Sequence, residues 1–264
     1  ASAFVNRRPE LRTRYSRRYN YQRAKNEDPK ALREWFNTVQ RVINENRILP
    51  EDIYNFDETG FAMGLISTAK VTVIESICAD GYILPPCVIF KGKNYCKSWF
   101  NNLPSNWRFE VSDNGWTTDK IGLRWLQKLF VPGTTTRTKG KYRLLILDGH
   151  GSHLTPQFDQ ICSENAIIPL RMPAHSSHLL QPLDIGCFAT LKRSYGRVIE
   201  SQARTGYNYI DKLDFLAAYL EARVEAYKSE TIRNSFASAG LVPLNAERVL
   251  FKAEYIASYA YTPQ

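Results

Sequence analysis

The sequence predicts an α/β fold built on one mixed sheet with helices on both faces. Residues 53–92 contain three runs typical of strands, and from residue 117 onward helical and strand-like patterns alternate along the chain. Two of the later runs, within 141–151 and 167–173, are continuously apolar, as in strands that are buried on both faces. Hydrophobic residues make up 44% of the 264 positions, which is ample for a core of this kind.

The composition also argues against several classes of protein. No run approaches eighteen uncharged apolar residues, so a membrane span is not expected. The N-terminus shows no apolar signal region, and because it lacks Met the sequence could be a fragment or a trimmed chain. The five cysteines are scattered without a C-x-x-C pair, so neither a zinc ribbon nor a disulfide framework is expected.

The first half of the chain should begin with a helix and continue with strands. Asp28 is the expected N-cap, followed by proline at the first helical position, and the helix should end at Leu49-Pro50. Three strands that form an antiparallel meander are then predicted within residues 53–60, 70–81 and 82–92. The first of them is expected to end at Asp57, and the polar and aromatic stretch 93–113 is expected to be irregular.

In the second half, helices and strands are expected to alternate. A helix should begin with Thr117 or Thr118 as its cap, and a long helix should start between Pro182 and Asp184. The other predicted elements are strands at 141–151 and 167–173, a short helix at 155–166 and helical structure over the remainder of the chain, with an apolar face at 215–220. Three strands, helix, strand, helix, strand and helix form the ribonuclease H-like order, with a five-stranded mixed sheet.

Three aspartates stand where predicted strands end or a helix begins. Asp57 and Asp148 each follow an apolar strand, and the carboxyl ends of strands are where sites form in open α/β sheets. Asp184 lies 36 positions after Asp148, at the start of the long helix. Each of them alone could be a capping residue, and Asp184 could simply cap its helix. Glu58 follows Asp57 directly, so on a strand it should face the other side of the sheet and make a structural contact.

If the three carboxylates converge, they predict a site for hard metal ions. Converging carboxylates repel one another unless cations hold them together, and oxygen-only ligands suit Mg²⁺ or Mn²⁺. Two such ions about 3.5–4 Å apart can activate a water and stabilise the leaving oxygen in phosphoryl displacement. In that case the cofactor would be Mg²⁺ or Mn²⁺, as a pair of ions, with Asp57, Asp148 and Asp184 as ligands; if they do not converge, each is an ordinary capping residue.

Three stretches of the sequence resemble the motif blocks of a known domain. They are NFDETG, LILDGHGSH and MPAHSSHLLQPLDIGCFATLKRSY. In this order they resemble the DDE superfamily endonuclease domain of pogo-like DNA transposases, a group that includes jerky-type and centromere protein B-type domesticated proteins. SFASAGLVPLNAERVL is similar to the stretch that closes that domain, so the resemblance covers roughly residues 30–250.

The resemblance implies a ribonuclease H-like fold and a protein that cuts and joins DNA with divalent metal. Carried over by motif, Asp57 is the first catalytic carboxylate, Asp148 the second and Asp184 the third. No motif position is visibly damaged, which favours an active enzyme. The expected domains are a basic arm at 1–27, which resembles the tail of a preceding helix-turn-helix region, a catalytic domain at 28–250 and a C-terminal tail at 251–264.

The four histidines allow two interpretations. His150 and His153 are three positions apart, as are His175 and His178, and such spacing occurs in structural zinc sites. The resemblance instead places them in the walls of the aspartate site. There His150, His153 or His178 could donate to a carboxylate or touch a DNA phosphate, and we favour this interpretation.

Positive charge is concentrated at the start of the chain. The net charge is +9, and residues 1–25 carry eight Lys or Arg and one Glu, which leaves about +2 for the remainder. Interleaved tyrosines make this arm a candidate for contacts with DNA phosphates, although a solvated arm or a nuclear-targeting segment would look the same. The candidate DNA-binding residues are Arg7, Arg8, Arg14, Arg17, Arg18, Lys192 and Arg193, and the last two could also be an ordinary solvated helix face.

We therefore expect the catalytic domain of a pogo-like DNA transposase. It would hydrolyse a phosphodiester at the transposon end and join the freed 3′-hydroxyl to target DNA. Its partner would be double-stranded DNA, with no membrane involved, and handling two ends together suggests a homodimer in the nucleus. Two alternatives are a domesticated DNA-binding or chromatin protein without nuclease activity, and an unrelated metal-dependent nuclease on the same fold.

Overall fold

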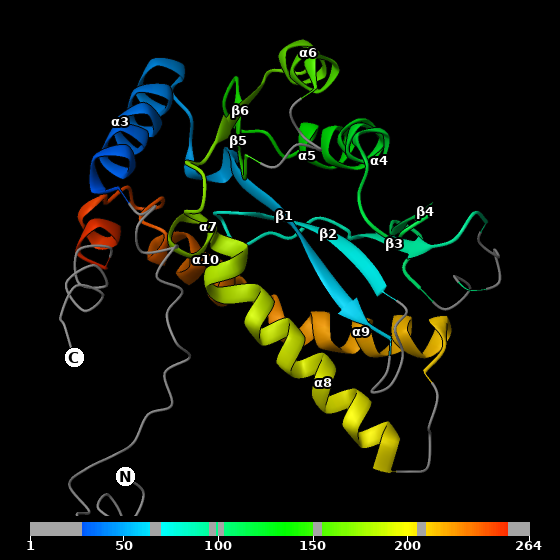
Figure 1. The fold of residues 1–264 in the computed structure, drawn as a ribbon. Coiled ribbons are helices and arrows are strands. Elements are labelled where there is room, and N and C mark those ends of the chain that lie inside the picture. Colours follow the sequence, from blue (N-terminus) through cyan, green and yellow to red (C-terminus); the bar gives the residue numbers. More distant parts are fainter. Residues whose placement is uncertain are drawn as a thin grey trace, which may run out of the picture.

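The structure is a computed structural model, which describes residues 28–63, 70–94, 99, 103–149, 155–204 and 210–252. Its centre is a six-stranded mixed sheet in the order β4-β3-β2-β1-β5-β6 (Figure 1). The strands are β1 (Ile53–Ala62), β2 (Lys70–Cys78), β3 (Cys87–Lys91), β4 (Arg108–Ser112), β5 (Arg143–Leu147) and β6 (Ile167–Arg171). The first three are antiparallel neighbours, as predicted, whereas β4, β5 and β6 pair in parallel with their neighbours.

The prediction of five strands was wrong, because β4 lies inside the stretch that was expected to be irregular. The strand pairs in parallel with β3, with Cys87 opposite Arg108. Charged and apolar residues alternate only over Arg108–Ser112, which is too short to stand out in the sequence. The edge strand β4 is stabilised by its hydrogen bonds to β3, which comes from an earlier part of the chain.

The prediction that the first strand ends at Asp57 was also wrong. Strand β1 continues to Ala62, because β2 pairs with it along its whole second half. The parallel partner β5 lies opposite Ile53–Asn55 only. What ends just before Asp57 is therefore the pairing with β5, and the aspartate stands at the edge of the parallel part of the sheet.

Two hydrophobic cores fill the two faces of the sheet, which confirms the helices predicted on both sides. One core packs against α3 (Pro29–Asn46), α8 (Phe188–Arg204), α9 (Lys212–Ala226) and α10 (Ser229–Ser238). The other packs against α4 (Asp119–Trp125), the π-helical turn η3 (Leu126–Phe130) and α6 (Pro156–Glu164). The remaining short elements are η1 (Pro50–Asp52), α5 (Val131–Thr135), α7 (Ser177–Leu180) and the π-helical turn η5 (Leu183–Cys187).

The predicted helix caps are found in the structure. Asp28 accepts a hydrogen bond from the Lys30 backbone N–H at 2.9 Å, and of the two threonines it is Thr118 that caps α4. Helix α3 ends before Arg47, which adopts a left-handed conformation, so it is slightly shorter than expected. In the described parts of the chain, no helix combines the length and apolarity that a bilayer crossing requires.

Candidate active site

The first two predicted aspartates stand side by side because their strands are parallel. Asn55 of β1 lies opposite Ile146 of β5. Asp57 and Asp148 each follow two positions further along, where β5 has ended and β1 continues. Asp184 is the second residue of η5, the turn that leads into α8. Three segments that are far apart in the sequence therefore deliver one aspartate each to the same end of the sheet.

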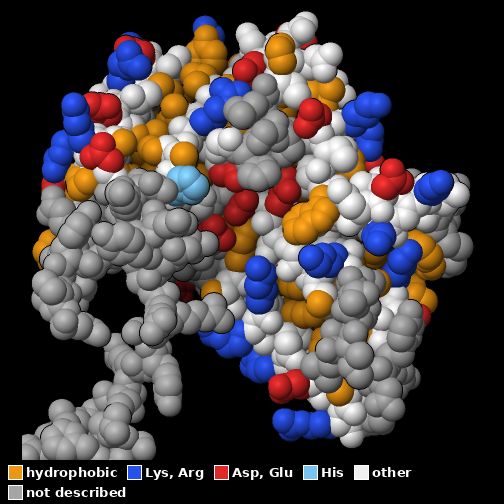
Figure 2. Space-filling view, viewed as in Figure 1, with side chains coloured by type: hydrophobic (Ala, Val, Ile, Leu, Met, Phe, Trp, Pro, Cys, Tyr) orange, Lys and Arg blue, Asp and Glu red, His pale blue; other side chains and the backbone are white. Residues whose placement is uncertain are grey.

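Asp148 and Asp184 line a hollow with a volume of about 720 Å³. Arg171 at the end of β6 lines it too, as do His175 and His178 on the segment that connects β6 to η5. Figure 2 shows acidic side chains gathered in a depression on this face, with a histidine close by. Of the predicted supporting histidines, His178 is thus brought to the site, whereas His150 and His153 lie outside the described residues.

The charges of the three aspartates act on one another. Burial raises the pKa of Asp57 well above its usual range, and the negative charges of Asp184 and then Asp148 raise it further. A backbone hydrogen bond at Glu58 and a side-chain hydrogen bond from Gln181 lower it. A cation at this place would relieve the repulsion that burial makes costly.

The donor set fits a hard divalent cation, but the ligands are not fully drawn together. All three groups offer carboxylate oxygens, the ligands that Mg²⁺ and Mn²⁺ prefer. Within the described ranges, however, no three side chains of the His, Cys, Asp or Glu type form a ready metal cluster. A metal ion held by all three aspartates would require a closer arrangement of the carboxylates than the structure shows.

Asn55 joins the three segments that carry the aspartates, and the sequence interpretation missed it. Its side-chain Nδ2 donates to the Ile146 carbonyl of β5 at 3.0 Å, and its Oδ1 accepts from the Leu183 backbone N–H at 3.2 Å. Leu183 directly precedes Asp184, and Ile146 lies two positions before Asp148. Asn55 is fully buried, so these bonds have no competition from water.

Gln181 completes this buried polar connection. Its Oε1 accepts from Asn55 Nδ2 at 3.1 Å, and its Nε2 donates to the Phe56 carbonyl at 3.2 Å. Gln181 also hydrogen-bonds to Asp57. The signal in the sequence was a polar residue inside an apolar strand, two positions before an aspartate, and a glutamine three positions before another. Buried amides of this kind persist only when they are hydrogen-bonded.

A buried ion pair lies on the strand next to Asp57. Glu75 of β2 is directly opposite Asp57 in the antiparallel register and has no exposed surface. Arg223 of α9 contacts both oxygens of Glu75, with Nε 2.9 Å from one and Nη2 3.0 Å from the other, and the Tyr219 hydroxyl donates to the same carboxylate. The pair fixes α9 to the sheet beside the aspartates.

Glu58 faces the opposite side of the sheet, as predicted. Phe56, on the same face of β1, belongs to the core under α4, where burial raises the pKa of Cys87 and the nearby charges, Glu58 last among them, act on it as well. Lys192 and Arg193 are exposed on α8, and Arg197 on the same helix pairs with Glu225. The five arginines of the basic arm that were predicted to bind DNA lie outside the described residues.

This site and fold define a transposase-like DDE endonuclease domain. The family model described as DDE superfamily endonuclease matches residues 68–236, and the chain belongs to this family. The matched range contains Asp148 and Asp184 and begins after Asp57.

Two curated relatives match this chain, and the second of them is a pogo transposable element protein, in agreement with the resemblance to pogo-like proteins. MFS-type transporter clz9 of Cochliobolus lunatus is 42% identical over 244 residues, which cover 84% of this chain and 26% of that protein. Pogo transposable element with ZNF domain of Homo sapiens is 29% identical over 133 residues, which cover 50% of this chain and 9% of that protein. The chain therefore spans only a minor part of the length of either relative.

Solved structures of Mos1 transposase have the same fold. A pre-cleavage Mos1 transpososome gives a TM-score of 0.58 at 12% identity, over 100% of this chain and 70% of that chain. The Mos1 mariner paired end complex with Mn gives 0.56 at 11% identity, over 99% and 71%. The paired end complex with Mg gives 0.56 at 13% identity, over 100% and 71%. The predicted ribonuclease H-like fold is thus confirmed.

Proposed function

We propose that this chain is the catalytic domain of an active DNA transposase, which cleaves DNA phosphodiesters and transfers the freed strand to target DNA. The observation that carries the proposal is the meeting of three aspartates: Asp148 after β5 and Asp184 of η5 line one hollow, and both charges act on the Asp57 carboxyl of β1. Asn55 ties these three segments together, which is expected of a site whose geometry matters. The same three residues are the positions that the family motifs assign to catalysis.

The proposed cofactor is Mg²⁺ or Mn²⁺, bound by the three aspartates as a pair of ions. The repulsion that raises the pKa of Asp57 and the oxygen-only donor set support this assignment. When bound, such ions activate a water and stabilise the leaving oxygen of a phosphodiester. The chain itself would hold the scissile phosphate near the aspartates, with Arg171 and His178 in the wall of the hollow as donors to phosphate oxygens.

The proposed partner is double-stranded DNA, as transposon ends and target. The printed names of the Mos1 structures, a transpososome and paired end complexes, support DNA as the substrate class. Arginines of the basic arm and exposed Lys192 and Arg193 would add phosphate contacts. A homodimer that handles two ends together and a location in the nucleus belong to the same proposal.

The test compares the wild-type chain with Asp148→Asn and with Asp119→Asn, a control at an exposed position on the opposite face of the sheet. Binding of Mg²⁺ or Mn²⁺ is measured by calorimetry, and nicking of a supercoiled plasmid is followed on the same samples. We expect metal binding and nicking in the wild type and the control, and loss of both in Asp148→Asn. Metal binding that survives Asp148→Asn, with no nicking by any of the proteins, would overturn the proposal.

The second candidate is a domesticated DNA-binding protein that has kept the fold without cutting. It is favoured by one observation, namely that among the described residues the carboxylates do not form a ready metal cluster. This candidate predicts DNA binding that neither depends on Mg²⁺ nor changes in Asp148→Asn, and no nicking under any condition. The same three proteins therefore distinguish the two functions.

A further inference from the structure

His175, in the wall of the aspartate hollow, has a backbone conformation that is unusual for histidine. Its φ is 63°, in the left-handed region that is uncommon for residues other than glycine. The Ser176 backbone N–H donates to the Pro173 carbonyl at 3.3 Å, so residues 173–176 form a β-turn with the histidine at its third position. Turns with a positive φ at the third position alone usually have glycine or asparagine there. The histidine therefore holds a conformation that is less favourable for it than for glycine.

Two other non-glycine residues among those described have a positive φ, and each of them follows a helix. Arg47, with a φ of 52°, is the C-cap of α3, and Ala166, with a φ of 53°, comes one position after the C-cap of α6. Helices often end with a left-handed residue, because this conformation satisfies their last carbonyl groups. His175 lies between β6 and α7 and follows no helix. Helix termination therefore explains the other two residues but not the histidine.

The chain on both sides of His175 is fixed in place. The Met172 N–H donates to the Leu147 carbonyl at 3.0 Å, so the pairing of β6 with β5 continues up to the residue that precedes the second aspartate. On the other side, Ser176 is buried, and its Oγ donates to the Pro173 carbonyl at 2.6 Å. The Ser176 carbonyl accepts from two backbone N–H groups of α7. The tertiary structure thus imposes the left-handed conformation and gives the histidine a defined position.

His175 is available to a ligand in the hollow. The residue is exposed and lines the hollow together with Asp148 and Asp184. Within the described ranges its imidazole makes no hydrogen bond or ion pair, so no internal bond offsets the strain of the turn. A neutral imidazole has one N–H donor, which suits an oxygen of a phosphate group. Strained residues that the surrounding structure holds in place cluster at sites where a ligand is bound.

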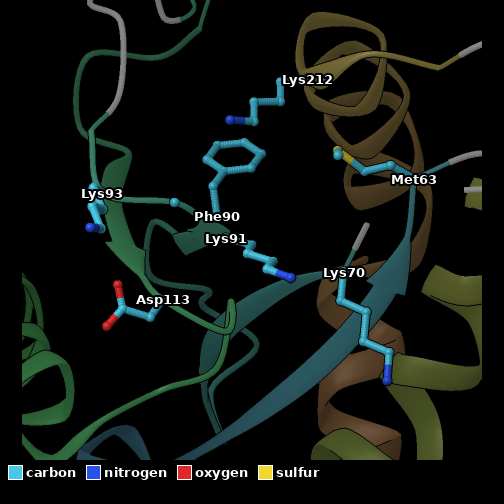
Figure 3. A pocket seen from close by; sticks show the side chains of 8 residues that line it. Met63, Lys70, Phe90, Lys91, Lys93, Asp113 and Lys212 are labelled. Carbon is cyan, nitrogen blue, oxygen red and sulfur yellow. The ribbon is translucent and has the colours of Figure 1, made fainter. Parts of the chain in front are cut away.

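A second hollow, beyond the end of β1, does not gather donors in this way among the described residues. Its volume is about 430 Å³. Lys70 is turned to the α4 face of the sheet, where its Nζ lies 5.5 Å from the centre of the Trp116 ring. Lys212 lies at the other face, with its Nζ 4.1 Å from the centre of the Trp99 ring and beside the Phe90 ring (Figure 3). These ammonium groups do not converge, so this hollow presents no single point for a phosphate.

We propose that His175 binds the DNA strand held at the aspartates, with its imidazole N–H donating to a phosphate oxygen of the backbone. The inference rests on the proposed function, because it takes the DNA to be bound in the hollow that Asp148 and Asp184 line. The strained turn holds the donor in place before DNA binds, which lowers the entropic cost of the contact. The contact is to the backbone, so it would be independent of base sequence.

The experiment compares the wild-type chain with His175→Gly, His175→Asn and Ala166→Gly. Glycine fits the left-handed conformation but removes the imidazole, whereas asparagine tolerates this conformation and keeps an N–H donor. Ala166→Gly is the matched control, because it relieves the same conformation at the other end of β6. Thermal unfolding, calorimetry with Mg²⁺ and fluorescence anisotropy with a labelled DNA duplex are measured on each protein. The anisotropy is measured with Mg²⁺ at low temperature, and a gel confirms that the duplex is uncut.

We expect His175→Gly to melt at the wild-type temperature or above it and to bind duplex about tenfold more weakly. His175→Asn should recover part of the affinity, and Ala166→Gly should melt higher and bind duplex as the wild type does. Mg²⁺ binding should be equal in all four proteins. Wild-type duplex affinity in His175→Gly would overturn the proposal. So would a lower melting temperature of this variant, since the histidine would then stabilise the turn, and so would its loss of Mg²⁺ binding, which would make the imidazole a metal ligand.

The outcome also separates this proposal from the proposed function. If the wild-type chain binds no duplex at all, the proposed function and the His175 contact both fail. If the wild type binds and nicks DNA and His175→Gly does so equally well, only the His175 contact fails. If His175→Gly binds duplex more weakly but no protein nicks plasmid, the contact stands and the cutting activity fails.

Discussion

At the scale of single residues, the aspartates depend on polar neighbours that carry no chemistry themselves. Asn55 and Gln181 are fully buried and bond to one another and to backbone groups of β1, β5 and η5. A buried amide that loses its partners leaves unsatisfied groups in an apolar surrounding. We therefore expect substitutions at these positions to act on the positions of Asp57, Asp148 and Asp184.

Asn55→Ala should lower the free energy of unfolding by about 3 kcal/mol, since it breaks several buried hydrogen bonds. Plasmid nicking should fall at least tenfold at temperatures where the variant is still folded. Urea unfolding and the nicking assay measure the two effects. The control is Thr72→Val on β2, which removes the buried bond from the Thr72 hydroxyl to the Gly115 carbonyl and should cost stability without loss of nicking. Equal nicking by Asn55→Ala and wild type would show that Asn55 has no positioning role.

Arg223→Met should destabilise the protein by about 3–5 kcal/mol, because it leaves Glu75 as an uncompensated buried charge. The double variant Glu75→Gln/Arg223→Met should recover much of this loss, and a double-mutant cycle in urea measures the coupling. The exposed pair Arg33–Glu247 provides the contrast, since Arg33→Met should change stability by less than about 1 kcal/mol. No recovery in the double variant would contradict this account.

At the scale of elements, η5 and α10 approach closely through Gly186. A Cβ atom at Gly186 would lie 2.0 Å from Oγ of Ser235 on α10. Gly186 is two positions after Asp184, so the close approach also determines where that aspartate stands. The motif that contains Asp184 therefore has a glycine at position 186 because α10 packs closely there, and not because the backbone turns.

Gly186→Ala should destabilise the protein by about 1–3 kcal/mol through overpacking and should reduce nicking. Ser235→Ala in the same chain removes the clashing hydroxyl and should restore part of the stability. Gly196→Ala on α8 is the matched control, because nothing lies within 4 Å of its added Cβ, and it should stabilise the exposed helix by about 0.5–1 kcal/mol. Thermal unfolding of the wild type, Gly186→Ala, Gly186→Ala/Ser235→Ala and Gly196→Ala tests this. Equal melting temperatures for Gly186→Ala and Gly196→Ala would contradict it.

At the scale of the whole molecule, the three aspartates that the proposed function requires lower the stability of the folded protein. The protein keeps three carboxylates near one another at the end of its sheet, and burial and mutual repulsion act against the charge of Asp57. A divalent ion would offset that cost, so the stability of the fold should depend on metal. A domain that only binds DNA would gain from losing one of these charges.

Asp57→Asn should raise the melting temperature in the absence of metal, by about 2–4 °C for each kcal/mol of relieved repulsion. Added Mg²⁺ should stabilise the wild type by about 1.4 kcal/mol at ten times its dissociation constant and leave Asp57→Asn nearly unchanged. Thermal unfolding with and without Mg²⁺ measures both effects, with Asp119→Asn as the control on the opposite face. Equal metal stabilisation of wild type and Asp57→Asn would exclude Asp57 as a ligand.

The local features of the chain were determined by the sequence itself. Asp28 and Thr118 cap their helices because a side-chain oxygen satisfies backbone N–H groups within three residues. The continuous apolar run before Asp148 predicts a buried strand, and alternation places Glu58 opposite to Asp57. These interactions span a few residues, so they can be recognised without knowing the fold.

Only the tertiary structure decided which groups meet. Three hydrogen-bond partners of Asn55 are 91 to 128 positions away, Glu75 meets Arg223 across 148 positions, and β4 exists because β3 lies beside it. Such contacts depend on strand order and register, which a sequence does not display, because the favourable energy arises only when distant segments are packed together.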